Sequence, residues 1–282
     1  MPKNEKLMNE IIKQSEVLTP MPAVAKRALW IMNDPAFNMK ELGEILATDQ
    51  AIASTLLRWA NSPYFGLVSP VATVPQAVAY LGENTVRNLV LTGALATYMD
   101  RPIPGYFLDR GELWKHSVGV AIAARMITEK FGKQLSEQAY TAGLLCDIGK
   151  LAFENMLRGI RIGAEWNGKS FEEIEEYYFG INHADLGAEL IHRWGLPAAL
   201  QEAIAFHHHP SAANTDTILP SAVHLGDSLI MMLGIGIGRD GLQYSVDPIV
   251  LERLRIGNTE MQSLLERLIP KMSEANNLIG EG

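Results

Sequence analysis

Histidine and aspartate side chains that could bind a metal ion are spread over the second half of the 282-residue chain. They fall on five segments with helical patterns and are His116, the Cys146-Asp147 pair, His183, the His207-His208 pair and Asp227. Imidazole and carboxylate groups from facing helices build metal sites in helical bundles, because rigid helices fix the ligand geometry. If these segments converge, the chain has the ligands for a metal site.

The stretch from Thr141 to Lys150, T-A-G-L-L-C-D-I-G-K, contains the central members of this set. Its apolar run is predicted to be buried, yet it ends in the carboxylate of Asp147 and the ammonium group of Lys150. An ionised carboxylate in an apolar setting costs several kcal/mol unless it is paired, hydrogen-bonded or bound to metal. A helix end whose charges reach water is the simpler alternative.

A metal-free core network would satisfy the same residues. His183 and His207 could be neutral, with Asp147 accepting hydrogen bonds from Lys150 or from helix N–H groups. Such a network also leaves no buried polar group without a partner. The residue types alone leave the metal site and the core network open.

Three further polar patterns have structural interpretations. His224 and Asp227 share a helix face and could form a hydrogen-bonded pair. The acidic run E-E-I-E-E follows a capping box of Ser170 and Glu173 and predicts a solvated helix face. The segment Gly234–Gly238 follows a helix and not a strand, which favours a helix-ending linker over a phosphate-binding loop.

The elements that carry these residues are predicted to be helices, and strand patterns are nearly absent. Helical spacing and capping signals predict helices over, among others, Gln50–Ala60, Asp109–Phe131, His183–Trp194 and Leu219–Leu233. Two prolines and a glycine interrupt the pattern between Asp100 and Gly105. We therefore expect an all-α protein with two packed helical subdomains, residues 1–100 and 101–282; one continuous helical body is the alternative.

The composition is that of a globular protein. Hydrophobic residues make up 48% of the chain, and apolar runs such as Leu229–Leu233 are far shorter than the roughly 18 residues of a membrane helix. The N-terminus lacks the apolar core of a signal peptide and the single cysteine allows no intrachain disulfide, so we expect a cytoplasmic protein. Because the apolar runs are short, we expect no membrane as partner. A net charge of −8 disfavours binding to phosphate backbones, so we expect no DNA either.

Two sets of motifs resemble the HDOD domain. The first set comprises Asp49, the R-W-A-N-S run at residues 58–62 and the pattern between Ala77 and Leu89. The second is H-A-D-L-G-A-E-L-I-H-R-W-G-L-P, from His183 to Pro197, followed by the paired histidines. The resemblance covers roughly residues 15–235. It implies an all-helical relative of the HD and HD-GYP metal-dependent phosphohydrolases, found mainly in bacterial signalling proteins, with an HD-like C-terminal subdomain.

The resemblance also implies a set of site residues. The metal ligands of the HD-GYP pattern fall on His116, Asp147, His183, His207, His208 and Asp227, and its phosphate-side lysine falls on Lys150. Cys146 replaces the histidine of the name-giving His-Asp pair and is the remaining ligand candidate. The metal implied is iron, manganese or zinc.

The replacement at Cys146 argues against full activity. A thiolate can bind zinc, but at about 2.3 Å instead of about 2.0–2.1 Å for imidazole, and from a shorter side chain. Loss of supporting contacts alone weakens metal affinity or activity about 10–100-fold. We therefore expect a degenerate or single-metal site, in which Asp147 and Lys150 are catalytic only if activity remains.

Three functions follow from these expectations. We favour a non-catalytic bacterial signal-transduction module that acts through a protein partner in trans. The first alternative is a metal-dependent phosphohydrolase, a phosphodiesterase acting on a nucleotide or a cyclic dinucleotide. The second is a domain that senses a nucleotide without hydrolysing it.

Overall fold

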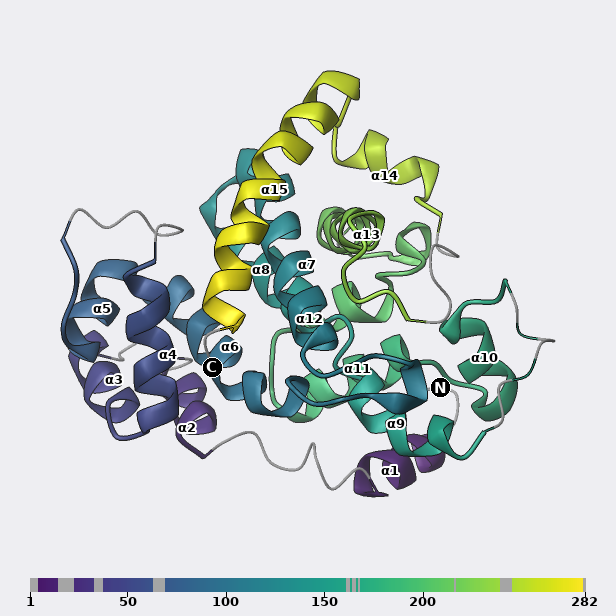
Figure 1. Ribbon diagram of the computed structural model, residues 1–282, viewed down its shortest axis with the longest axis horizontal. Helices are drawn as coiled ribbons and strands as arrows, with labels where there is room; N and C mark the ends of the chain where they lie inside the picture. Colours follow the sequence, from purple (N-terminus) through teal and green to yellow (C-terminus); the bar gives the residue numbers. More distant parts are fainter. Residues whose placement is uncertain are drawn as a thin grey trace. The chain divides into compact units, whose positions relative to one another are not determined.

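The computed structural model describes residues 5–14, 23–32, 38–62, 69–160, 163, 166, 168–215, 217–238 and 245–280. Within these ranges the protein is all-α, which confirms the predicted fold class (Figure 1). The same ranges contain no β-strand and one isolated bridge, between Ile103 and Leu108. None of their helices is both long and apolar enough to cross a bilayer.

The chain divides into two compact units. One comprises Met1–Thr19 and Met99–Leu268, and the other comprises Pro20–Tyr98 and Ile269–Gly282. The change of unit after Tyr98 lies close to the expected boundary at residue 100. The two chain ends are grouped differently from the expected ranges, because the N-terminal end belongs to the larger unit and the C-terminal end to the smaller one. The N-terminal helix α1 (Glu5–Gln14) packs on helices of the larger unit and buries Met8 and Ile11.

Side-chain caps begin two of the helices of the smaller unit. Its elements are α2 (Ala23–Met32), α3 (Met39–Leu46), α4 (Gln50–Ala60), α5 (Val74–Leu81) and most of α6 (Glu83–Met99). Asn38 caps α3 by accepting a hydrogen bond from the backbone N–H of Lys40, and Thr73 caps α5. The helices pack around fully buried leucines, among them Leu42, Leu46 and Leu56.

Three long helices form the centre of the larger unit. They are α7 (Glu112–Thr128), α8 (Lys133–Leu145) and α13 (Ile218–Met232), and each packs against the other two. Residues are buried on all sides of α7 and α13, as expected for helices surrounded by protein. The polar groups His116 of α7 and Asp227 of α13 are therefore inside the core.

Shorter helices surround this centre. They are η1 (Pro104–Tyr106), η2 (Glu129–Phe131), α9 (Lys150–Arg158), α10 (Phe171–Phe179), α11 (His183–Arg193), α12 (Ala198–Ala205), η4 (Pro210–Ala212), α14 (Pro248–Arg253) and the start of α15 (Asn258–Gly280). A capping box of Ser170 and Glu173 begins α10, as predicted, and one of Asn182 and Asp185 begins α11. These two caps fix where the chain enters α10 and α11, the helices that carry the next set of polar residues.

Candidate metal centre

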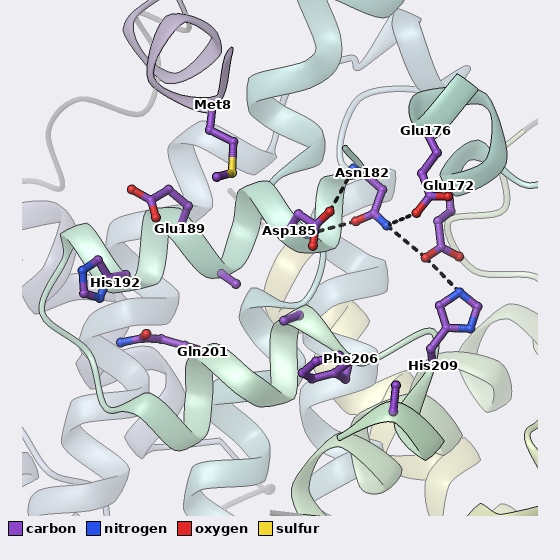
Figure 2. Close-up of a pocket in the computed structure, with 13 residues that line it drawn as sticks. Met8, Glu172, Glu176, Asn182, Asp185, Glu189, His192, Gln201, Phe206 and His209 are labelled. Atoms are coloured by element: carbon purple, nitrogen blue, oxygen red, sulfur yellow. Dashed lines mark hydrogen bonds and ion pairs between the residues drawn. The ribbon is translucent and has the colours of Figure 1, made fainter. Parts of the chain in front are cut away.

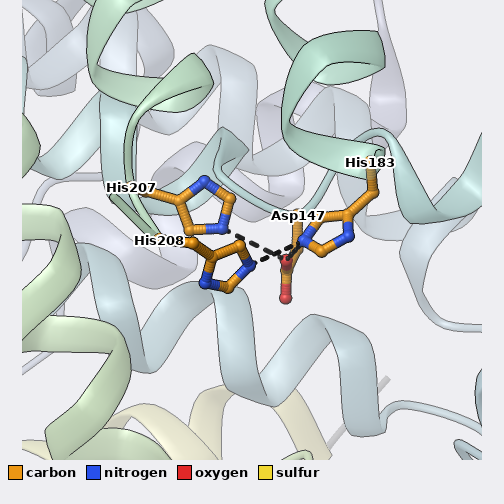
Figure 3. A group of neighbouring side chains, drawn as sticks. All are labelled: Asp147, His183, His207 and His208. Atoms are coloured by element: carbon orange, nitrogen blue, oxygen red, sulfur yellow. Dashed lines mark hydrogen bonds and ion pairs between the residues drawn. The ribbon is translucent and has the colours of Figure 1, made fainter. Parts of the chain in front are cut away.

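Four of the predicted ligands lie together in the larger unit. The ligand atoms of Asp147, His183, His207 and His208 are all within 4.8 Å of one another (Figure 3). Asp147 follows α8, His183 is the first residue of α11, and the paired histidines follow α12. All four side chains are buried or nearly so. The structure thus brings together groups that are up to 61 residues apart in the sequence.

A glycine allows the aspartate to approach the first histidine. Gly149 lies in the turn between α8 and α9, and a Cβ atom at this position would be 2.0 Å from the backbone oxygen of His183. The turn can therefore rest against the first turn of α11 only because residue 149 has no side chain. This contact sets Asp147 Oδ1 at 3.4 Å from His183 Nε2.

Three histidine rings are held through Nδ1. The acceptors are Glu175 Oε2 for His183 at 2.7 Å, the Ile204 carbonyl for His207 at 2.7 Å and the Ile235 carbonyl for His116 at 3.1 Å. Each ring therefore turns Nε2 toward Asp147, at 3.4 Å, 3.9 Å and 3.4 Å respectively. Histidines that bind metals are oriented in this way, by a hydrogen bond from the nitrogen that does not bind the metal.

The glycine segment after α13 holds the His116 ring. Gly236 has a positive φ of 66°, and a Cβ atom here would lie 2.5 Å from the Cβ of His116. The neighbouring Ile235 carbonyl accepts the His116 hydrogen bond. The segment predicted to be a helix-ending linker does follow α13, and it also turns back to cover this histidine.

His116 and Asp227 form a second group beside the first. His116 Nε2 lies 2.9 Å from Asp227 Oδ1 and 3.4 Å from Asp147 Oδ2. Lys150 Nζ lies 2.8 Å from the same Asp147 oxygen. Asp147 therefore connects the two groups, with Oδ1 facing His183 and Oδ2 facing His116 and Lys150.

The hypothesis of a His224–Asp227 pair is wrong. Asp227 pairs with His116, whereas His224 Nδ1 donates to the His207 carbonyl at 2.7 Å. His224 Nε2 accepts from the backbone N–H of Asp247 at 3.0 Å. The sequence spacing placed both side chains on one helix, but their partners come from other segments, and His224 fixes the backbone of the paired histidines.

Cys146 does not join the cluster. Its thiol is fully buried and donates to the Gly143 carbonyl, at 3.2 Å, inside its own helix. Burial raises the pKa of this thiol well above its usual value, and the nearby charge of Asp147 raises it further. The side chain is therefore a neutral thiol directed at the α8 backbone, and the geometry gives no support to a ligand role.

Two members of the cluster are charged in the metal-free protein. Burial would raise the pKa of Asp147, but Lys150 first, then His183 and His116, hold it well below its usual value. Burial would lower the pKa of His183, but the charge of Glu175 and hydrogen bonds to Asp147 and Glu175 raise it to about 10. The carboxylate thus lies among cationic or polarised groups on both sides.

The paired histidines are neutral. Burial, reinforced by the charge of His183, lowers the pKa of His207 to about 4. Burial and the neighbouring His207 lower the pKa of His208 well below its usual value. Since His207 donates through Nδ1, its Nε2 carries a lone pair, and this buried atom has no hydrogen-bond partner within the described part of the chain. A buried nitrogen lone pair next to a carboxylate fits a metal cation.

The acidic helix α10 was predicted to be solvated, which is wrong for half of its glutamates. Glu173 and Glu176 are exposed, but Glu172 and Glu175 are buried against the start of α11. Glu175 accepts from the His183 ring, and Glu172 is 3.1 Å from His209, the exposed last member of the three consecutive histidines. Sequence analysis missed Glu175 because four glutamates in five residues give no sign of which one faces inward.

A groove lies next to the elements that hold the cluster (Figure 2). Its volume is about 630 Å³, and its lining includes Glu172, Glu176, Asn182, Asp185 and His209. Asn182 donates to both Glu172 and Glu176, which ties α10 to the start of α11. The groove walls therefore include the segments that present His183 and His208, together with α10 and Met8 of α1.

Comparisons with known proteins agree with this description. An HDOD domain protein of unknown function from Geobacter sulfurreducens has a similar structure, with 23% identity, a TM-score of 0.71 and coverage of 98% of this chain and 95% of that one. A provisionally named phosphohydrolase from Shewanella amazonensis is 24% identical, with a TM-score of 0.74 and coverage of 96% and 97%. At such identities the likeness shows the fold alone.

A curated relative and a family match complete the comparison. An uncharacterised protein of Treponema pallidum is 24% identical over 235 residues, which are 81% of this chain and 45% of that protein. The chain thus spans less than half the length of this relative. Residues 18–210, more than half of the chain, match the HDOD domain family. The chain belongs to the HDOD domain family.

Proposed function

We propose that this HDOD protein is a regulatory module that holds one metal ion, does not turn over phosphate esters, and acts through a signalling protein in trans. The ligands in this proposal are Asp147, His183, His207 and His208, which lie within 4.8 Å of one another. Iron or zinc suits the three imidazole ligands, and manganese suits the carboxylate of Asp147. The cytoplasmic location and the protein partner are predictions that this proposal retains.

The position of the Cys146 thiol carries the proposal. The residue beside Asp147 directs its side chain to the Gly143 carbonyl, so it offers no ligand near His116. On that side of Asp147, the Lys150 ammonium group already lies 2.8 Å from Oδ2. A second metal ion on that side would be repelled by the ammonium group and would lack the ligand that a histidine at position 146 would supply. Both effects argue against a two-metal hydrolase.

The chemistry that remains available is limited. A bound metal would supply Lewis acidity and would lower the pKa of a water molecule bound to it. His183 and His207 would bind it through Nε2, and Lys150, whose side chain is 14% exposed, could contact an anion only by loosening its pair with Asp147. The lysine that the family pattern assigns to phosphate is thus engaged within the protein.

Two observations bear on the alternatives. The His116–Asp227 pair, at 2.9 Å, favours the phosphohydrolase alternative, because it could supply part of a second metal site. The Shewanella protein's provisional name points the same way. By contrast, the carboxylates of Glu172, Glu176 and Asp185 in the groove would repel phosphate groups, so nucleotide sensing there is disfavoured.

Metal analysis combined with a hydrolysis assay tests the proposal. Protein purified without chelator and without metal-affinity resin should contain about one transition-metal ion per chain. It should hydrolyse cyclic dinucleotides and nucleotide phosphodiesters no faster than the Asp147→Ala variant. Metal-dependent turnover that this variant lacks would establish the hydrolase alternative, and absence of any bound metal would leave the core network as the role of these residues.

A Cys146→His variant separates a degenerate site from an intact one. If the thiol position is what disables hydrolysis, the variant should gain metal-dependent turnover or a second metal ion. A variant that folds and binds one metal ion, still without turnover, would show that the thiol at this position is not by itself what prevents hydrolysis.

A further inference from the structure

Glu175 is a wholly buried carboxylate with three hydrogen-bond donors around it. Its Oε2 accepts from the backbone N–H of His183 and from His183 Nδ1, each at 2.7 Å. Its Oε1 accepts from the hydroxyl group of Tyr106 in η1. A buried carboxylate is tolerated when its oxygens are satisfied in this way, and none of these donors comes from solvent.

The bond to Glu175 determines which ring nitrogen of His183 can bind a metal. Because Nδ1 donates to Glu175, Nε2 is the nitrogen that lies 3.4 Å from Asp147 Oδ1 and 2.9 Å from His208 Nε2. The backbone bond to the same carboxylate oxygen fixes the start of α11 as well as the ring. Both constraints act on the first residue of one helix.

His183 differs in its hydrogen-bond acceptor from the other two rings that turn Nε2 toward Asp147. His116 and His207 donate to neutral backbone carbonyls, those of Ile235 and Ile204, whereas His183 donates to a charged carboxylate. A carboxylate acceptor makes the opposite ring nitrogen a stronger metal ligand than a neutral acceptor does. His183 is therefore the ring best prepared to bind a cation.

We propose that Glu175, held in place by Tyr106, is a positioning residue that fixes the His183 ring so that Nε2 faces the metal centre. This inference rests on the proposed metal site and goes beyond it, because neither residue belongs to the predicted ligand set. Glu175 does not bind the metal itself, since its oxygens are taken up by His183 and Tyr106. Its effect on the metal passes entirely through His183.

The test compares Glu175→Gln with Glu176→Gln in the full-length protein. Glu176 is the next residue of α10 and is exposed. It accepts from Asn182 instead of from the His183 ring, and a glutamine keeps an oxygen for that bond, so the control makes the same chemical change away from the ring. Zn²⁺ affinity is measured by competition with a chelating dye, and ¹⁵N NMR of the histidine rings reports the protonation and hydrogen bonding of each His183 ring nitrogen. The His183 signals are identified by their loss in His183→Gln.

Glu175→Gln should weaken Zn²⁺ binding about 10–100-fold and shift the His183 ring signals, while Glu176→Gln changes neither. Tyr106→Phe should shift the His183 ring signals in the same direction by a smaller amount. If circular dichroism shows that Glu175→Gln does not fold, Tyr106→Phe is used for the test instead. A folded Glu175→Gln protein with wild-type affinity and unchanged ring signals would overturn the inference. If the wild type binds no Zn²⁺, the proposed metal site fails, whereas the ring signals still decide whether Glu175 positions His183.

Discussion

The two oxygens of Asp147 face different surroundings. Oδ1 lies near His183 and His207, at 3.4 and 3.9 Å, and the neutral His208 completes that side. Oδ2 lies 2.8 Å from the Lys150 ammonium group and 3.4 Å from His116, which is itself paired with another carboxylate. On the Oδ1 side the neutral His207 offers a nitrogen lone pair, and a metal ion can displace the proton of His183, whereas the Oδ2 side contains the ammonium group of Lys150.

This difference shows how one carboxylate can take part both in a hydrogen-bonded core network and in a metal site, the two interpretations that the sequence left open. The Oδ2 side contains the Asp147–Lys150 contact of the expected core network, and the Oδ1 side contains the histidine cluster that fits a metal ion. The two sides share Asp147 alone, so changes made on each side should have separable effects on metal binding and on stability.

Removing the charge of Asp147 should affect both sides and have the largest effect. Asp147→Asn removes the anionic partner of the half-buried Lys150 and one of the two anionic partners of the buried His183, which should cost about 3–5 kcal/mol of unfolding free energy. It should also reduce metal affinity at least about 100-fold. Chemical denaturation and metal titration measure the two effects, with Glu266→Gln on the exposed surface of α15 as a control that changes neither. A stable Asp147→Asn protein would show that the pairs on the Oδ2 side contribute little.

Single histidine variants should separate the two sides. His207→Gln removes a buried nitrogen lone pair on the Oδ1 side and should weaken metal binding about 100-fold. His116→Gln changes a ring engaged with Asp227 on the Oδ2 side, so the affinity should fall no more than about threefold. Isothermal titration of both variants with one metal gives the comparison. Equal losses would mean that metal binding involves both sides of Asp147.

Metal binding on the Oδ1 side should strengthen as the pH rises. The pKa of His183 is raised to about 10, so near neutral pH its Nε2 carries a proton that a metal ion must displace. Release of one proton makes the affinity rise about tenfold per pH unit below that pKa. Competition titrations at pH 6, 7 and 8 measure the slope, and His183→Gln should flatten it. A flat profile in the wild type would place the metal away from His183.

Removing the Cys146 thiol should have the smallest effect. Because Sγ is directed at the Gly143 carbonyl, Cys146→Ala should leave metal content and affinity unchanged. The small loss of buried volume should cost about 1 kcal/mol of unfolding free energy. Elemental analysis and thermal melting check these outcomes, and a loss of metal in the variant would show that the thiol turns toward the cluster when metal is present.

Local signals in the sequence predicted much of the fold. Gln50–Ala60 is a helix with the predicted bounds, and Asn182 and Ser170 begin helices as their side-chain chemistry requires. Such features depend on neighbours a few residues away, which are visible in the sequence. The family motifs pointed to the members of the cluster, since helical spacing alone could not show that α8, α11 and α12 meet.

Features that depend on distant packing could not be predicted. The inward direction of Glu175 is set by the position of α11 and η1 against α10, not by the pattern of α10 itself. Likewise, the packing of α13 on α7 decides that Asp227 pairs with His116. In each case the residue type was informative and its orientation was not.

The backbone contact at Gly149 has a consequence for how such a centre can change over time. The turn that carries Asp147 rests on the backbone oxygen of His183, so its position does not depend on the identity of any ligand side chain. Substitution of one ligand can therefore abolish a reaction while the cavity keeps its shape. A fold of this kind can lose catalytic activity during evolution and still keep a stable surface that other proteins recognise.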